Sequence, residues 1–160
     1  IGGTVFGYQV LDPERYGVVE FDTKGKVVSI KEKPEKPLSN FAVTGLYYLD
    51  SSASDRVENI KPSDRGELEI TDLLESYLEE KVLDVELLGR GFSWLDTGTE
   101  DSLIEASEFV KAIQKRQGLS IGCPEEISLL KGWIDKEKLE EMLVDLPSNN
   151  YSSYLHSLLK

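Results

Sequence analysis

The sequence is poor in the residues that mark several common protein classes. Its 160 residues contain one cysteine, Cys123, so no internal disulfide can form, which fits a reducing compartment. No apolar run approaches the roughly 18 to 20 residues needed to cross a bilayer, and the first residues do not form a secretory signal. We therefore expect a soluble, cytoplasmic protein.

Basic residues are also scarce. The chain has 18 Lys and Arg against 30 Asp and Glu, which gives a net charge of −12. Because nucleic acids and anionic membranes bind basic surfaces, neither is expected as a partner. If the ligands are phosphates, the cations that hold them must be concentrated locally. What is present is enough apolar sequence, 39% of the residues, to bury a core and fold.

The first half of the chain has the local patterns of short strands and turns. β-Branched and aromatic residues favour strands, whereas Pro34 and Pro37 indicate an irregular loop across 31–40. The stretch at 43–49, which lacks polar alternation, suits a sheet covered on both faces. Strands are predicted at 4–10, 18–21, 26–30, 43–49 and 82–88, with a hairpin through 22–25.

Helical periodicity dominates the remainder. Ser63 or Asp64 is expected to cap one helix, and Gly118 to end another. Strands followed by helices predict an α/β or α+β layer arrangement with a helical tail. Helices are predicted at 53–60, 67–79 and 101–117, the last with Leu103, Ala106, Val110 and Ile113 on one face, and the tail at 124–160 is mostly helical.

Three places could carry chemistry, and the first is the strand end at Lys33. A point charge just before Pro34 suits a phosphate, and Gly17 in the preceding turn leaves room for a ligand to approach the backbone. Alternating charge at a strand end is also typical of a solvated edge, and for this motif alone that interpretation is favoured.

The second place is the turn at 61–67. Arg65 offers a planar donor fork for a phosphate or for sugar hydroxyls, and Gly66 lets the backbone pass close by. An N-capped helix start explains the same residues. Both interpretations can hold together.

The third place is 94–99, where Asp96 leaves a predicted strand into a turn of small residues. A structural Asx turn explains this aspartate as well as a functional role does. Mg²⁺ usually takes one or two protein carboxylates and fills its other positions with water and phosphate oxygens. A single aspartate can therefore be half of a magnesium site.

Together these motifs resemble successive blocks of the glucose-1-phosphate thymidylyltransferases, in order and in spacing. The similarity continues through 101–106, 115–118 and 123–127, so it covers nearly the whole chain. The blocks are DPERYGVVEF at 12–21, EKP at 32–34, AVTGLY at 42–47, RGELEIT at 65–71, LGRG at 88–91 and WLDTGT at 94–99.

The resemblance implies a fold, an activity and a set of sites. The fold is α/β, a partial nucleotide-diphospho-sugar transferase (Rossmann-like) fold with a mixed sheet, a sugar-binding subdomain and C-terminal helices. The activity joins glucose 1-phosphate to dTTP, with Mg²⁺, and releases pyrophosphate. It also implies a homotetramer that feeds dTDP-sugars such as rhamnose into surface polysaccharide.

The family's site residues carry over onto matching positions of this sequence. Lys33, Arg65 and Asp96 would be catalytic, and Asp96 would bind the magnesium. The sugar 1-phosphate would contact Gly17, Glu32, Lys33, Val43 and Arg65, with Trp94 as a wall near the sugar. A regulatory nucleotide site would use Gly89, Arg90, Gly122, Glu126 and Ile127.

One part of the family's pattern has no counterpart. The glycine-rich nucleotide loop and a second magnesium aspartate lie at the family's amino terminus, and no G-x-G-x-x-G or G-x-x-x-x-G-K occurs here. We therefore expect a C-terminal portion that lacks the N-terminal nucleotide-binding segment and is inactive alone. Its expected domains are a sugar-phosphate and metal part at 1–118 and a helical oligomer or regulatory tail at 119–160.

Two alternatives stay open. The enzyme could be a sugar nucleotidyltransferase that uses uridine or cytidine triphosphate, because base choice in the family is set mainly in the half expected to be absent. The chain could also act alone as a noncatalytic sugar-phosphate-binding or assembly module. His156 and Cys123 are expected to be bland packing or surface residues, since an anionic sugar phosphate needs no general base and no histidine lies near Cys123 in sequence.

Overall fold

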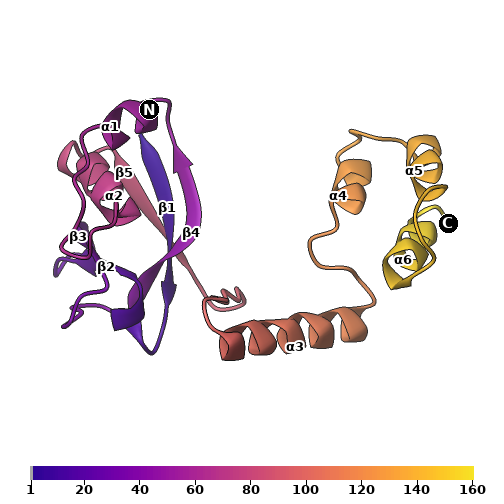
Figure 1. The fold of residues 1–160 in the computed structure, drawn as a ribbon, viewed down its shortest axis with the longest axis horizontal. Helices are drawn as coiled ribbons and strands as arrows, with labels where there is room; N and C mark the ends of the chain where they lie inside the picture. The colour runs from indigo at the N-terminus through magenta and orange to yellow at the C-terminus, as the bar shows by residue number, and fades with distance from the viewer. Residues whose placement is uncertain (1) are drawn as a thin grey trace. The chain divides into compact units, whose positions relative to one another are not determined.

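The computed structural model describes residues 2–160 and divides into two compact units (Figure 1). The first unit ends at Trp94, and the second runs from Leu95 to Lys160. Across residues 2–160, no helix combines the length and the apolar character that crossing a bilayer requires. The functional division after residue 118 stays a prediction.

The described part of the first unit holds one mixed sheet with strand order β3-β2-β4-β1-β5. Strand β1 pairs antiparallel with β4 and parallel with β5, while β2 is antiparallel to both β3 and β4. A parallel pair requires a crossover connection, and α1 and α2 lie between β4 and β5 in the chain. The prediction of an α/β fold with a mixed sheet is confirmed. The strands are β1 (Gly3–Gln9), β2 (Gly17–Phe21), β3 (Val27–Glu32), β4 (Phe41–Leu49) and β5 (Leu83–Leu88), with a short 3-10 helix, η1 (Pro13–Arg15), between β1 and β2.

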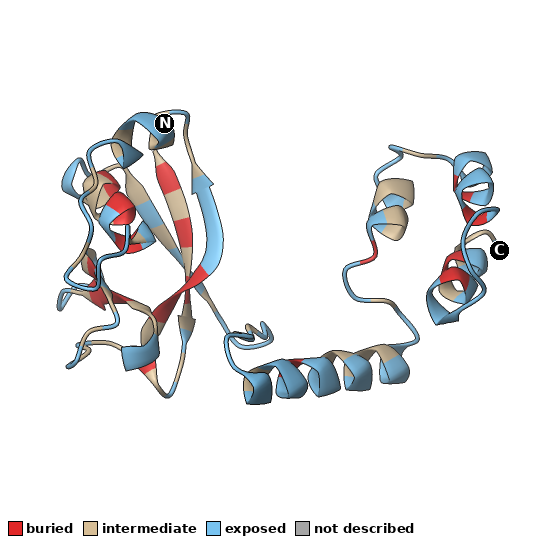
Figure 2. Ribbon diagram, in the orientation of Figure 1, coloured by how far each residue is buried: buried red, intermediate tan, exposed pale blue. Residues whose placement is uncertain are grey.

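The core of this unit lies between the sheet and α2 (Ile70–Glu79). Val5, Val19, Ile30 and Val43, one from each of four strands, pack with Leu74 of α2. Figure 2 shows these buried segments on α2 and on the central strands. Full burial of such side chains contributes about 1.5 to 3 kcal/mol each, so this contact fixes where α2 begins relative to the strand ends.

The two halves of β4 differ in burial. Its first half is buried, but Leu46 is 52% and Tyr48 67% exposed in its second half. The prediction of a sheet covered on both faces is therefore wrong for this half of β4. Leu46, Tyr47 and Tyr48 are consecutive and exposed, and successive strand residues point to opposite faces, so side chains on both faces of this half are open.

Two local predictions near the candidate site have different outcomes. The hairpin between β2 and β3 is confirmed, with Gly25 in the left-handed region at φ 79°. The cap assigned to Ser63 or Asp64 is wrong, because α2 begins at Ile70 after Glu69. Ser63 instead closes a tight turn over 63–67, in which its N–H donates to the carbonyl oxygen of Glu67 at 2.8 Å.

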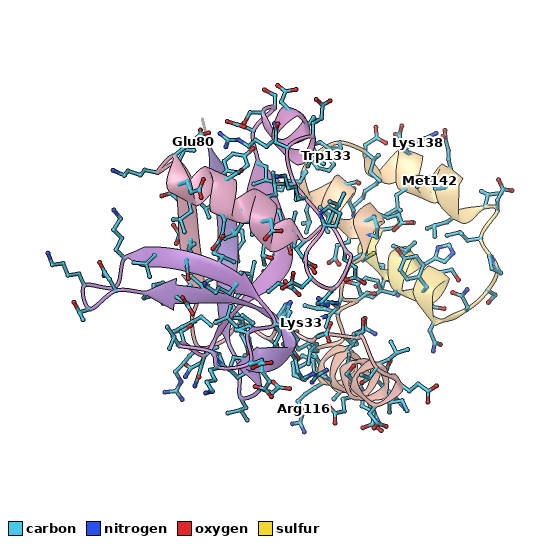
Figure 3. All side chains as sticks on the ribbon, turned by 60° about the vertical axis from the view of Figure 1, so that its left-hand side comes forward. Lys33, Glu80, Arg116, Trp133, Lys138 and Met142 are labelled. Atoms are coloured by element: carbon cyan, nitrogen blue, oxygen red, sulfur yellow. The ribbon has the colours of Figure 1, made fainter. Side chains whose placement is uncertain are left out.

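Helix α1 (Ala53–Val57) is held to α2 by a polar cluster. The Asp50 carboxylate accepts hydrogen bonds from the Ser52 and Tyr77 hydroxyls, at 2.6 and 3.1 Å. The Arg56 guanidinium lies 4.1 Å from the Tyr77 ring centroid and pairs with Glu80, labelled in Figure 3 at the end of α2. These contacts compensate for the absence of any fully buried residue in α1.

The second unit begins with α3 (Glu100–Gln117). A capping box between Thr99 and Ser102 starts this helix, and Gly118 ends it at φ 71°, as predicted. Of the predicted apolar face, Ala106 is buried and Leu103 is 54% exposed. Periodicity identified the helix correctly but did not show what its face contacts.

Three further helices form a small core in the tail. Cys123, Leu139, Leu143 and Leu155 are buried together, so Cys123 is a small core residue, as expected. Met142, labelled in Figure 3, is 40% exposed and lies outside this core. The helices are α4 (Pro124–Leu130), α5 (Lys136–Leu143) and α6 (Asn150–Leu158).

Candidate functional site

The end of the β2–β3 ladder gathers several predicted site residues around a glycine. Gly17, the first residue of β2, is the partner of Glu32, the last residue of β3. A Cβ atom on Gly17 would lie 2.8 Å from Thr71 Cγ2, 3.2 Å from Glu32 Oε2 and 3.9 Å from Val43 Cβ. Gly17, Glu32 and Val43 therefore do lie together, and Thr71 at the start of α2 joins them.

Lys33 follows the end of β3 in an unusual backbone conformation. Its φ of 39° is in the left-handed region, which a residue other than glycine rarely adopts. Its N–H donates to the Tyr16 carbonyl oxygen at 3.0 Å, which holds the turn. The ammonium group lies 4.0 Å from Glu32 Oε1, and the side chain is 45% exposed. The strained turn thus places a partly exposed cation beside the Glu32 carboxylate.

Arg65 reaches the same carboxylate from the turn before α2. Its Nη1 lies 3.8 Å from Glu32 Oε1 and 3.3 Å from Glu69 Oε1, and its Nη2 lies 2.9 Å from Glu67 Oε2. The Glu69 side chain is 10% exposed and that of Glu67 is 63% exposed. Lys33 and Arg65, which are far apart in sequence, are therefore both brought within 4.0 Å of the same oxygen, Glu32 Oε1.

The surroundings of Glu32 favour its protonated form, although two cations lie close to it. Burial, and then the nearby Glu69 carboxylate, raise the pKa of Glu32, while the Lys33 and Arg65 cations oppose that rise. Burial and the Glu32 carboxylate also raise the pKa of Tyr47. A guanidinium fork and an ammonium can hold a phosphate, and a half-buried carboxylate can accept sugar hydroxyls. The arrangement suits a ligand that carries both a phosphate and sugar hydroxyls.

Trp94, the last residue of the first unit, lies near two tyrosine rings. Its ring centroid is 5.2 Å from that of Tyr16, edge-on, and 6.0 Å from that of Tyr8. Residues 93–97 form no strand, so the prediction that Asp96 leaves a strand is wrong. The segment is irregular because no neighbouring strand pairs with it.

Asp96 belongs to the second unit, unlike Lys33 and Arg65. Its carboxylate turns over the following loop, since a Cβ on Gly98 would lie 3.2 Å from Asp96 Oδ2. Within residues 2–160, no group of three or more His, Cys, Asp or Glu side chains is arranged to hold a metal ion. A single carboxylate fits magnesium that takes its other ligands from water and substrate, and does not fit a cage built wholly of protein.

Comparison with known proteins assigns the chain to a family. A family model described as nucleotidyl transferase matches residues 1–113. The chain belongs to the nucleotidyl transferase family. The glucose-1-phosphate thymidylyltransferase of Xanthomonas campestris pv. campestris strain B100 is 60% identical over 99% of the chain, and that of Neisseria meningitidis is 54% identical over 99%. The chain spans about half the length of these curated relatives, 54% and 55%.

Solved structures share the fold of this nucleotidyl transferase chain. A glucose-1-phosphate thymidylyltransferase from Bacillus anthracis, in complex with a sucrose, has a TM-score of 0.60 at 42% identity over 68% of this chain and 43% of its own. A UDP-glucose pyrophosphorylase complexed with UDP-glucose has a TM-score of 0.59 at 28% identity over 72% of this chain and 45% of its own. The partial nucleotidyltransferase fold is thereby confirmed.

The comparisons correct the prediction that the chain is the C-terminal portion of the enzyme without its nucleotide-binding segment. The nucleotidyl transferase match begins with the first residue of the chain and occupies 1–113. The chain therefore corresponds to about 55% of the relatives' length, and the family match lies at the start of the chain.

The predicted regulatory residues of this nucleotidyl transferase fall in both units. Gly89 and Arg90 follow β5 and line a cavity of about 580 Å³ with Tyr8 and Phe92 among others. The remaining three lie near the start of α4, where the Tyr154 hydroxyl donates to Glu126 Oε2 at 2.7 Å; they are Gly122, Glu126 and Ile127. Their assignment stays a prediction.

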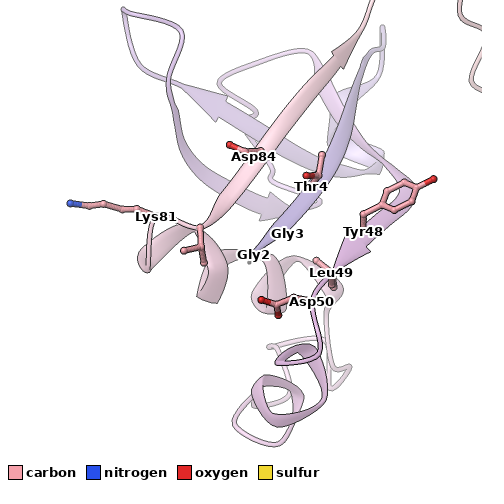
Figure 4. A pocket seen from close by; sticks show the side chains of 9 residues that line it. Gly2, Gly3, Thr4, Tyr48, Leu49, Asp50, Lys81 and Asp84 are labelled. Atoms are coloured by element: carbon pink, nitrogen blue, oxygen red, sulfur yellow. The ribbon is translucent and has the colours of Figure 1, made fainter.

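A cavity of similar size contains none of the predicted site residues. It encloses about 590 Å³ at the other end of β1, between Thr4, Tyr48, Asp50 and Asp84 (Figure 4). Asp50 is already engaged by Ser52 and Tyr77, and no cluster of cations lies along this wall. Volume alone therefore does not mark the site here, because a phosphate requires converging donors.

Sequence reasoning missed three side chains of the Glu32 cluster. Glu69 and Thr71 lie in the block RGELEIT, where acidic residues were interpreted as helix-dipole partners, and Tyr47 lies in a strand interpreted as core. The available signal was the spacing of the acidic residues, since Glu67 and Glu69 follow Arg65 by two and four residues, close enough to pair with it.

Proposed function

We propose that the chain forms the sugar-1-phosphate-binding and metal-holding part of an enzyme that makes dTDP-glucose and pyrophosphate from dTTP and glucose 1-phosphate. The observation that carries this proposal is the convergence of Lys33 and Arg65 on Glu32, next to Gly17, which packs too closely against Thr71 and Glu32 to carry a side chain. The relatives named as glucose-1-phosphate thymidylyltransferases support the choice of substrates.

Each side chain has a role that follows from its chemistry. Lys33 and Arg65 hold the phosphate of glucose 1-phosphate, and the Glu32 carboxylate accepts hydrogen bonds from sugar hydroxyls. The exposed phosphate oxygen attacks the α-phosphorus of dTTP. Because this oxygen is already anionic at neutral pH, the reaction needs no general base, and catalysis consists of positioning and charge neutralisation.

Asp96 would hold the magnesium ion, together with water and phosphate oxygens. When bound, the metal would neutralise charge that develops on the phosphates. Trp94 would form a wall near the sugar, since its ring is fixed by Tyr8 and Tyr16. We propose in addition that the complete enzyme is a homotetramer of dTDP-rhamnose biosynthesis, with the regulatory nucleotide site assigned above.

The first test is calorimetric titration of the 160-residue chain with glucose 1-phosphate, with glucose as the uncharged comparison. Lys33→Ala should weaken binding of glucose 1-phosphate by about 1.5 to 3 kcal/mol, as for loss of a hydrogen bond to a charged group, and should leave binding of glucose unchanged. Lys31→Ala, an exposed lysine on the same strand, is the matched control. Equal effects of the two substitutions would remove Lys33 from the site.

The second test separates the enzyme from a noncatalytic binding module and fixes the base. Pyrophosphate release by the complete enzyme is measured with dTTP, UTP and CTP. We expect dTTP to be preferred and Asp96→Asn to nearly abolish release with Mg²⁺. Preference for UTP would favour the UDP-glucose pyrophosphorylases, which share this fold. Normal magnesium-dependent turnover by Asp96→Asn would remove the metal assignment.

A further inference from the structure

The residue before α2, Glu69, has a largely buried side chain that does not cap the helix. Its side chain is 10% exposed and makes no cap hydrogen bond. Instead, Glu69 Oε1 accepts a hydrogen bond from the Ser63 hydroxyl at 2.8 Å and one from Arg65 Nη1 at 3.3 Å. The same Ser63 oxygen accepts the Arg65 backbone N–H at 3.3 Å. Glu69 therefore ties both the turn and the guanidinium of Arg65 to the buried start of α2.

The neighbouring Glu67 provides a natural contrast. It lies closer to Arg65, at 2.9 Å, yet its side chain is 63% exposed. An exposed ion pair is screened by water and costs side-chain entropy, so it restrains its partner weakly. A buried carboxylate that is fixed by a second hydrogen bond restrains its partner more strongly. Judged by distance alone, Glu67 would be expected to restrain Arg65 more strongly than Glu69 does.

We infer that Glu69 is a positioning residue that holds Arg65 toward Glu32 and thereby preorganises the phosphate-binding fork. This inference rests on the proposed function, because it concerns the arginine that would bind the sugar phosphate. Arginine loses considerable side-chain entropy when it is fixed. A fork already held in place avoids most of that loss when the ligand binds.

The sign of the effect separates positioning from simple charge repulsion. Glu69 is an anion next to an anion-binding group, so repulsion alone predicts that Glu69→Gln strengthens binding of glucose 1-phosphate. Positioning predicts that the same substitution weakens it, because glutamine keeps the size and an acceptor but loses the charge that holds Arg65. We expect about a fivefold weakening for Glu69→Gln.

The experiment combines binding with the motion of Arg65. Titration of glucose 1-phosphate into the 160-residue chain is compared for Glu69→Gln and for the matched Glu67→Gln, which should change affinity less than about twofold. In an Arg65→Ala background, Glu69→Gln should have no further effect. Separately, the ¹⁵N relaxation of the Arg65 Nε–H should show greater motion in Glu69→Gln and unchanged motion in Glu67→Gln, with no ligand present.

The outcomes distinguish this inference from the proposed function. Unchanged Arg65 motion in Glu69→Gln overturns the inference whether or not the ligand binds. A Glu69→Gln effect that persists in the Arg65→Ala background, or tighter binding, overturns it as well. If Arg65→Ala itself leaves the affinity for glucose 1-phosphate unchanged, the proposed function fails, while the motion of Arg65 still reports on Glu69.

Discussion

Gly17→Ala tests whether the close approach of three elements at the candidate site has the cost that the geometry implies. The new Cβ would lie 2.8 Å from Thr71 Cγ2, a distance at which something must shift. Thr71 is 1% exposed and cannot swing into solvent, whereas Glu32, at 3.2 Å, is half-buried and can move. Overpacking of this kind costs about 1 to 3 kcal/mol, and the displaced Glu32 should weaken binding of glucose 1-phosphate.

The matched control is Gly45→Ala in β4, where a Cβ would meet nothing within 4 Å. That substitution should be neutral or stabilising by up to about 1 kcal/mol, because alanine loses less backbone entropy than glycine on folding. Both variants are compared in a Trp133→Phe background. Trp133 is 72% exposed, so its loss is tolerated, and Trp94 then remains as the one tryptophan and reports on the first unit.

The assay is urea unfolding followed by Trp94 fluorescence, with the free energy of unfolding obtained by linear extrapolation. Adding Thr71→Ser removes the crowded methyl group and should recover about 1 kcal/mol of the loss in Gly17→Ala. Equal stabilities of Gly17→Ala and Gly45→Ala would refute the reasoning. Additive costs of Gly17→Ala and Thr71→Ser would show that the contact with Thr71 is not the cause.

Three further predictions follow from the local chemistry. The pKa of Glu32 is raised above its ordinary value of 4.5, so between the unfolded and the folded pKa the folded chain binds more protons than the unfolded chain. The free energy of unfolding should therefore fall as pH rises from 4.5 through the folded pKa. Glu32→Gln should flatten this pH dependence, which urea midpoints at several pH values would show. Thr99→Ala should cost about 1 kcal/mol by removing the cap of α3, seen as lost ellipticity at 222 nm, and an unchanged spectrum would contradict the capping role. Arg56→Ala should lower the urea midpoint of the first unit, because it removes the contact of Arg56 with the Tyr77 ring. Lys138→Ala removes only an exposed ion pair with Glu141 and should leave unfolding unchanged. Equal effects of the two substitutions would contradict the role of the Arg56–Tyr77 contact.

Residue type alone was enough to propose some members of the candidate site, whereas others depend on distances that only the structure gives. Lys33 and Arg65 are recognisable because a cation beside proline or glycine suits a phosphate. Glu69 was missed because a carboxylate before a helix looks like a dipole partner. Its contacts with Ser63 and Arg65 exist only because the turn at 63–67 folds back over it.

Local sequence determined most of the elements of this protein. The hairpin at Gly25, the end of α3 at Gly118 and the capping box at Thr99 follow from backbone preferences and hydrogen bonds within a few residues. Tertiary structure alone decided that Gly17 must lack a side chain, that β4 is covered over only part of its length, and that two distant cations share one carboxylate. The reason is that short-range propensities fix dihedral angles, whereas packing of α2 on the sheet sets the distances between elements.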